Sequence, residues 1–136
     1  LMKRRLIPLS TVITPNIPEA EVLTGVTIRG IKDIQQSARL LHQLGAKNVV
    51  IKGGHYRKAQ DKTFDIVFDG SRFEIIRGNF YSGKFHGTGC AYSSALTVYL
   101  GQGLSLYQSA KKARCLVVSA IRSHIDVGLG MSILGV

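Results

Sequence analysis

Two short apolar runs separated by a segment of helix length constrain the fold of this chain more than any other sequence feature. The runs cover residues 11–14 and 48–52 and are rich in β-branched side chains, which favours buried strands. Between them, over residues 31–44, apolar residues recur at helical spacing. Strands joined by a helical crossover run parallel and are covered by helices. The sequence therefore predicts an α/β fold, a three-layer α/β/α arrangement with a mostly parallel sheet.

The remaining segments indicate where a ligand would bind. Ligands of open α/β sheets lie beyond the carboxyl ends of the strands. We therefore expect the loops after Thr14, Lys52 and Ile76 to share one edge of the sheet. The other expected elements are a helix over residues 17–23, hairpin strands over 63–68 and 72–76 around Asp69-Gly70, helices over 91–100 and 106–125, and a turn over 128–130.

Composition narrows the classes of function. The chain has 136 residues, of which 45% are hydrophobic and 19% charged, as in one ordinary globular domain. Its net charge of +10 is typical of a nucleic-acid binder, of a protein with anionic small substrates, or simply of a solubilising surface. The basic residues are scattered and not interleaved with aromatic residues, so we expect no nucleic-acid partner. No apolar run approaches the roughly 18–20 residues of a membrane span, so we expect no membrane partner.

The chain has two cysteines, Cys90 and Cys115, which lie far apart in the sequence. This number and spacing do not suggest a disulfide framework, and we expect a reducing, cytoplasmic location. Cys115 stands beside Leu116 and Val117 in the middle of a predicted helix, where we expect it to belong to the core.

The most informative stretch is residues 86–91, with the sequence HGTGCA. Glycines beside a helix start let backbone N–H groups converge, and the helix dipole adds positive charge there. Such a turn suits an anion, or an oxyanion that develops in a transition state. The same dipole favours the thiolate of Cys90, which would suit a general base or a nucleophile. The alternative is a tight turn with a small, buried cysteine.

A second candidate site is the start of the first predicted helix. Asn16 and Glu19 are three residues apart and follow a strand end. Oxygen ligands of this kind suit Mg²⁺ that is held through water beside a phosphate. The simpler interpretation is a helix cap, with an acid that stabilises the first turn.

A third candidate is Lys52, at the end of an apolar strand and followed by Gly53, Gly54 and His55. A lysine in this position can reach a phosphate as a point charge. Alternatively, it extends from the strand end into solvent.

Together, these elements resemble the hydroxymethylpyrimidine (phosphate) kinases of thiamin biosynthesis, which belong to the ribokinase-like superfamily. The resemblance rests on residues 9–20 (LSTVITPNIPEA), 45–55 (GAKNVVIKGGH) and 86–90 (HGTGC), and covers residues 6–130. Cys90 is the most discriminating residue, because most ribokinase-like enzymes carry aspartate after the Gly-Thr-Gly. Some similar pyridoxal kinases share the cysteine.

The resemblance implies ATP- and Mg²⁺-dependent phosphorylation of hydroxymethylpyrimidine and then of its monophosphate. It implies that the N–H groups of Gly87, Thr88 and Gly89 form an anion hole and that Cys90 accepts the proton of the substrate hydroxyl group. It further implies that Lys52 binds ATP phosphates, with a contribution from Thr88, and that Asn16 and Glu19 organise Mg²⁺, mainly through water.

Two departures from the family pattern limit the resemblance. Complete family members are about twice as long, so we expect residues 1–136 to be the C-terminal part of a single kinase domain whose N-terminal half is absent. Such a half would expose an unpaired sheet edge, so we expect a homo-oligomer or association with the missing half. The tail, residues 128–133, also lacks the Gly-Pro that is usual in the family.

Three alternatives therefore stay open. The first is a pyridoxal or pyridoxine kinase. The second is a non-catalytic nucleotide-binding fragment that needs a partner chain. The third is a basic nucleic-acid binder, whose affinity would depend steeply on salt concentration.

Overall fold

The computed structural model describes residues 2–54, 62–83, 85–127 and 131–135. The chain divides into two compact units, Leu1–Phe80 and Tyr81–Val136.

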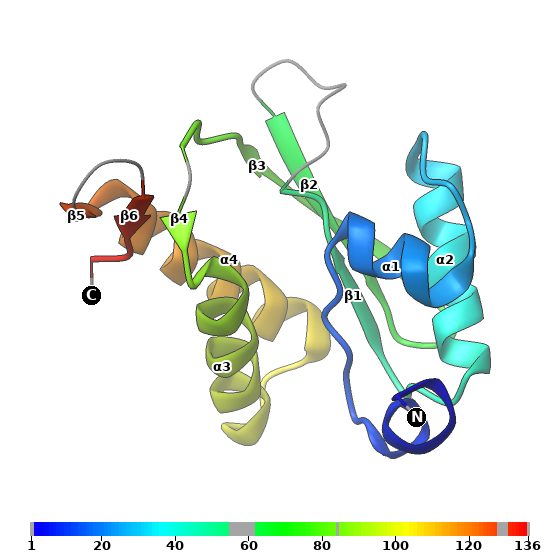
Figure 1. Ribbon diagram of the computed structural model, residues 1–136. Coiled ribbons are helices and arrows are strands. Elements are labelled where there is room, and N and C mark those ends of the chain that lie inside the picture. The colour runs from blue at the N-terminus through cyan, green and yellow to red at the C-terminus, as the bar shows by residue number, and fades with distance from the viewer. Residues whose placement is uncertain (1, 55–61, 84, 128–130, 136) are drawn as a thin grey trace. The chain divides into compact units, whose positions relative to one another are not determined.

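In the first unit, the helices come first along the chain and the strands of its sheet follow (Figure 1). Its elements are η1 (Met2–Leu6), η2 (Ile7–Leu9), α1 (Ile17–Thr24), α2 (Ile31–Gln43), β1 (Val49–Lys52), β2 (Lys62–Phe68) and β3 (Phe73–Asn79). The second unit contains β4 (Phe85–His86), α3 (Thr88–Gly101), α4 (Leu106–Arg122), β5 (Ile125–Val127) and β6 (Met131–Ile133).

The sheet of the first unit has the strand order β1-β2-β3, and both strand pairs are antiparallel. The segment before α1 runs parallel to β1 through isolated bridges from Ile13 to Val49 and from Asn16 to Lys52. The α/β class is confirmed. The parallel orientation expected for residues 11–14 and 48–52 is also confirmed by these bridges, whereas the strand pairs β1–β2 and β2–β3 are antiparallel. Residues 53–61 join β1 to β2, and this connection is too short for the crossover that a parallel pair requires.

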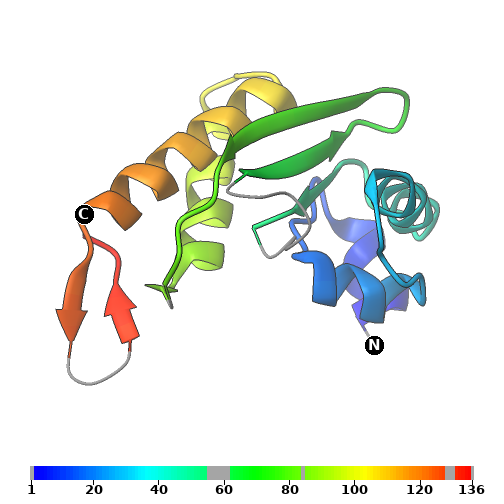
Figure 2. The ribbon, with the colours of Figure 1, turned by 90° about the horizontal axis from the view of Figure 1, so that it is seen from above.

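Helices α1 and α2 share one core with this sheet (Figure 2). Side chains alternate along a strand, so Phe64, Ile66 and Phe68 of β2 lie on the core face. Thr63, Asp65 and Val67 lie on the other face and are also buried. The buried core cluster consists of Ile7, Ile17, Ala20, Ile34, Ala38, Leu41, Ala46, Val49, Ile51, Phe64, Ile66 and Phe68.

The second unit is built on the packing of α3 against α4. Small side chains, among them Ala95, Ala110 and Ala113, are buried between these helices and allow close approach. The hydroxyl group of Tyr92 donates a hydrogen bond to the carbonyl oxygen of Ala110 at 3.3 Å. Strand β6 pairs with β4 in parallel and with β5 in antiparallel orientation.

Two expectations for this unit are corrected. Helix α4 ends at Arg122 and not at residue 125, because Ile125 begins β5. Cys115 is exposed and does not belong to the core, because the buried face of α4 consists of Ser109, Ala110, Ala113, Val117 and Ala120. The turn expected at residues 128–130 lies outside the described residues. Within the described part of the chain, no helix combines the length and apolar character needed to cross a bilayer.

Candidate functional site

Asn16 and Lys52 lie side by side at one edge of the first unit. They are partners in a parallel bridge, and the Lys52 N–H donates to the carbonyl oxygen of Pro15 at 2.9 Å. Across the sheet, Lys52 is paired with Asp65, and Asp65 is paired with Ile76. The expected meeting of the segments after residues 14, 52 and 76 is therefore confirmed for the backbone of this unit, although β3 continues three residues past Ile76.

Asn16 and Glu19 form a reciprocal cap at the start of α1. The Glu19 N–H donates to Asn16 Oδ1 at 2.8 Å, and the Asn16 N–H donates to Glu19 Oε2 at 2.9 Å. These bonds match the simpler of the two sequence interpretations. An ionised carboxylate has about four acceptor positions, so the cap leaves acceptor capacity on Glu19.

The oxygen atoms of Asn16 and Glu19 fit Mg²⁺ that keeps most of its water. Among the described residues, no group of three or more His, Cys, Asp or Glu side chains could hold a metal directly. Mg²⁺ characteristically keeps several waters and uses one or two carboxylates together with substrate phosphates. The donor set therefore fits a water-mediated ion, and it does not fit a protein cage.

The turn after Lys52 is held against β2. The Gly53 N–H donates to Asp65 Oδ1 at 3.1 Å. A Cβ atom at Gly53 would lie 1.9 Å from the carbonyl oxygen of Phe64, so only glycine fits there. Gly54 is exposed, and His55 lies outside the described residues.

The start of α3 carries the Gly-Thr-Gly-Cys sequence. Gly87 is the N-cap residue, with a φ angle of +88° that favours glycine, and no side chain caps the helix in the described structure. The Ala91 N–H already donates to the Gly87 carbonyl oxygen at 2.9 Å. The N–H groups of Gly87, Thr88, Gly89 and Cys90 precede it and have no partner within the helix by α-helical geometry. These groups and the helix dipole make this turn suitable for an anion.

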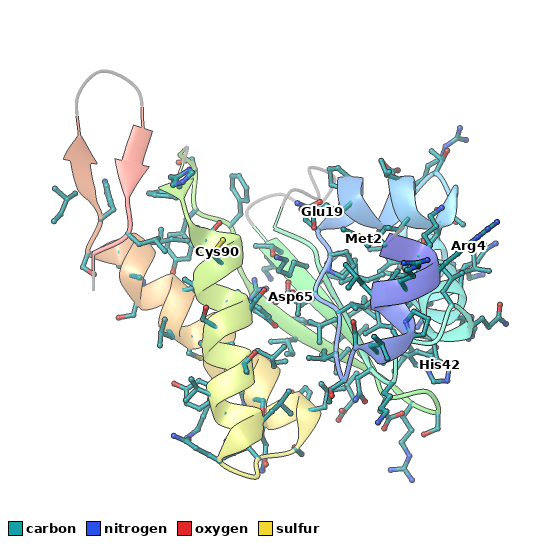
Figure 3. The ribbon with its side chains drawn as sticks, turned by 60° about the horizontal axis from the view of Figure 1, so that its bottom comes forward. Met2, Arg4, Glu19, His42, Asp65 and Cys90 are labelled. Atoms are coloured by element: carbon teal, nitrogen blue, oxygen red, sulfur yellow. The ribbon has the colours of Figure 1, made fainter. Side chains whose placement is uncertain are left out.

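Cys90 lies in the first turn of α3 and is exposed (Figure 3). The alternative of a buried, structural cysteine is therefore wrong. No acidic residue lies in this first turn, so nothing within it offsets the positive end of the helix.

The structure thus distributes the sequence-predicted residues over two groups. Asn16, Glu19 and Lys52 belong to the first unit, and Gly87–Cys90 belong to the second. Asp65 was not predicted from the sequence. A single acid within the apolar run Phe64–Phe68 was the available signal, because charged residues are rarely buried without a partner.

Comparison with known proteins identifies the family. A family model described as phosphomethylpyrimidine kinase matches residues 1–134. The chain is 42% identical over 130 residues to the hydroxymethylpyrimidine/phosphomethylpyrimidine kinase of Bacillus subtilis. This match covers 95% of the chain and 48% of the relative, so the chain spans about half the length of that curated relative.

Solved structures with the same fold include two kinases. Pyridoxal kinase from Staphylococcus aureus in complex with ADP matches with a TM-score of 0.92 and 32% identity, over 98% of this chain and 49% of the kinase chain. Phosphomethylpyrimidine kinase from Clostridium difficile 630 matches with a TM-score of 0.71 and 34% identity, over 88% and 47% of the two chains. These matches confirm the ribokinase-like α/β fold.

Proposed function

We propose, from the premise that this chain belongs to the phosphomethylpyrimidine kinase family, that it carries the phosphate-handling half of a kinase active site. The reaction is transfer of phosphate from ATP to hydroxymethylpyrimidine, and then to its monophosphate, in thiamin biosynthesis in the cytoplasm. The observation that carries this proposal is the start of α3, where glycine replaces a side-chain cap and Cys90 is exposed.

In this proposal, Gly87, Thr88 and Gly89 stabilise the charge on the phosphoryl group during transfer. The hydroxymethyl oxygen of the substrate attacks the γ-phosphorus, and the bond from that phosphorus to the ADP oxygen breaks. Cys90 accepts the proton of the hydroxyl group. Positioning and charge neutralisation account for most catalysis of this kind.

We assign the binding of ATP phosphates and of Mg²⁺ to the first unit. Lys52 binds the phosphates of ATP as a point charge. Asn16 and Glu19 orient the water shell of Mg²⁺, and their reciprocal hydrogen bonds hold both side chains in place. Mg²⁺, when bound, neutralises charge on the phosphate oxygens.

An apolar groove supports the proposal that this chain forms part of a larger kinase domain. The groove, of about 670 Å³, lies between η1, the segment before α1, and α1 itself. Met2 is 55% exposed, Leu6 56% and Val22 79%. We assign the groove to the half of the kinase domain that curated relatives have in addition to the matched region.

This surface also makes association of the isolated chain expected, as a homo-oligomer or with that half. In the full-length protein, Val22→Asp is expected to lower stability, and an unchanged melting temperature would contradict the assignment.

Pyridoxal kinase is the second candidate function, because the S. aureus enzyme has the higher TM-score of the two kinases compared. The TM-score measures backbone agreement, whereas side chains select the substrate. We therefore give more weight to the 42% identity with the B. subtilis pyrimidine kinase.

A turnover assay on the full-length gene product and on residues 1–136 tests the proposal. With MgATP, the full-length protein is expected to phosphorylate hydroxymethylpyrimidine in preference to pyridoxal when both are present. Preference for pyridoxal would favour the second candidate. MgADP binding without turnover of either substrate would contradict catalysis and favour a nucleotide-binding role.

A further inference from the structure

A buried carboxylate lies directly beside the proposed phosphate-binding lysine. Asp65 is in the middle of β2 and is 2% exposed. Its neighbours along the chain, Phe64 and Ile66, belong to the apolar core on the opposite face. Burial of an ionised carboxylate is unfavourable unless hydrogen bonds or opposite charge compensate, so the position calls for a specific role.

The register of β1 and β2 places Asp65 opposite Lys52. Residues directly opposite each other in an antiparallel pair project from the same face of the sheet, with Cβ atoms about 4.5–5.5 Å apart. The carboxylate of Asp65 and the ammonium group of Lys52 therefore belong to the same face as cross-strand neighbours of opposite charge.

Asp65 also holds the backbone of the turn that follows Lys52. Its Oδ1 accepts the N–H of Gly53 at 3.1 Å. The close approach of Gly53 to the carbonyl oxygen of Phe64 fixes the same turn from the adjoining residue of β2. Strand β2 therefore contacts the Gly53 turn through two groups. These are the side-chain carboxylate of Asp65 and the backbone carbonyl group of Phe64.

We propose that Asp65 is a positioning residue that fixes Lys52 and the Gly53 turn for binding of nucleotide phosphates. Its carboxylate has two tasks: one oxygen anchors the Gly53 N–H, and its negative charge orients the Lys52 ammonium group. This inference rests on the proposed function, because it takes the phosphates of a nucleotide as the ligand of Lys52.

Asp65→Asn separates the two tasks, because asparagine keeps an acceptor oxygen of the same reach but removes the charge. We expect this variant of the full-length protein to keep slow hydrogen exchange at the Gly53 amide. We expect its affinity for MgADP, measured by calorimetry, to fall about tenfold, the scale of one lost charge-assisted contact. Asp65→Ala should lose both the amide protection and the affinity. Glu74→Gln is the matched control, because Glu74 is an exposed acid on the neighbouring strand β3.

A double-mutant cycle with Lys52→Met shows whether Asp65 acts through Lys52. The account predicts that Asp65→Asn weakens MgADP binding far less in the Lys52→Met background than in the wild type. Equal weakening in both backgrounds, or an Asp65→Asn variant that binds MgADP like the wild type, would overturn the inference and leave the proposed function intact. Failure of the wild-type protein to bind MgADP would overturn both.

Discussion

Helices α1 and α3 begin in opposite ways, although both follow a strand or an extended segment. Asn16 and Glu19 satisfy backbone donors at the start of α1 with their own side chains. At the start of α3, Gly87 supplies no side chain, and the first turn contains no acid. Helix α4 resembles α1, because Ser105 and Gln108 form the same reciprocal cap.

The difference distinguishes helix starts that stabilise the fold from a helix start that can bind a ligand. A capped helix start satisfies its own N–H groups, whereas a glycine start leaves them to water or to a ligand. Among the described α-helices, α2 also lacks a side-chain cap, but its first turn contains Asp33, whose negative charge offsets the positive end of that helix. The α3 start has neither device, which makes it the strongest candidate for a phosphate site.

The largest expected effect concerns the thiol at the start of α3. In the full-length protein, Cys90→Ala is expected to lower kcat by about 10²–10⁴, because the general base is lost. Stability should change little, since Cys90 is exposed. Cys115→Ala, on the exposed side of α4, is the matched control and should leave kcat unchanged. Wild-type turnover in Cys90→Ala would remove Cys90 from the mechanism.

Alanine substitutions at two glycines of similar backbone geometry distinguish the effect of backbone strain on stability from an effect on turnover. Gly87 and Gly103 have φ angles of +88° and +85°, and an added Cβ atom would meet nothing within 4 Å at either position. Alanine at each should therefore cost about 1–2 kcal/mol of unfolding free energy through backbone strain alone. Chemical denaturation measures this cost. Only Gly87→Ala should also lower turnover by more than the loss of folded protein explains. Equal turnover in both variants would contradict a special role for the start of α3.

The reciprocal caps of α1 and α4 allow the structural role of Asn16 to be distinguished from its proposed role in metal binding. Asn16→Ala and Ser105→Ala should each lower stability by about 1 kcal/mol. Only Asn16→Ala is expected to raise the Mg²⁺ concentration for half-maximal turnover, by about tenfold. A Mg²⁺ titration of both variants measures the difference. The same Mg²⁺ requirement in both would reduce Asn16 to a helix cap.

The smallest expected effect lies at the hairpin turn, where a carboxylate satisfies nearby donors as it does at the start of α1. The N–H groups of Arg72 and Ser71, followed by the Ser71 hydroxyl group, hold the pKa of the Asp69 carboxyl below its ordinary value. The resulting stability is present above the ordinary pKa and is lost as the pH falls through the lowered folded value. Asp69→Asn should therefore be less stable than the wild type near neutral pH, and the gap should close in acid. Urea midpoints measured across pH test this, and a gap that widens in acid would contradict it.

Local patterns predict much of the first unit because the interactions that they describe are local. The Asn16 cap and the Asp69-Gly70 hairpin depend on residues within a few positions of each other. The antiparallel pairing of β1 with β2 depends instead on the length of the intervening connection. The sequence patterns predicted the parallel orientation of the segments around Ile13 and Val49, but they did not indicate that β2 would be the antiparallel neighbour of β1.

The candidate site shows the same limit. The motif residues were predictable because glycine, cysteine and lysine stand at element ends. Asp65 was not, because its role depends on the register that places it opposite Lys52 and beside Gly53. Cys115 was misplaced because the buried face of α4 follows Ala113 and Val117, and Cys115 lies between them on another face.

The most direct test of the account is an amide NMR titration of the full-length protein with MgADP. We expect the N–H resonances of Gly87, Thr88 and Gly89 to shift together with binding, whereas those of Leu106 and Gln108 at the capped start of α4 stay in place. Saturable MgADP binding without any change at Gly87, Thr88 and Gly89 would contradict the assignment of the phosphate site to the start of α3.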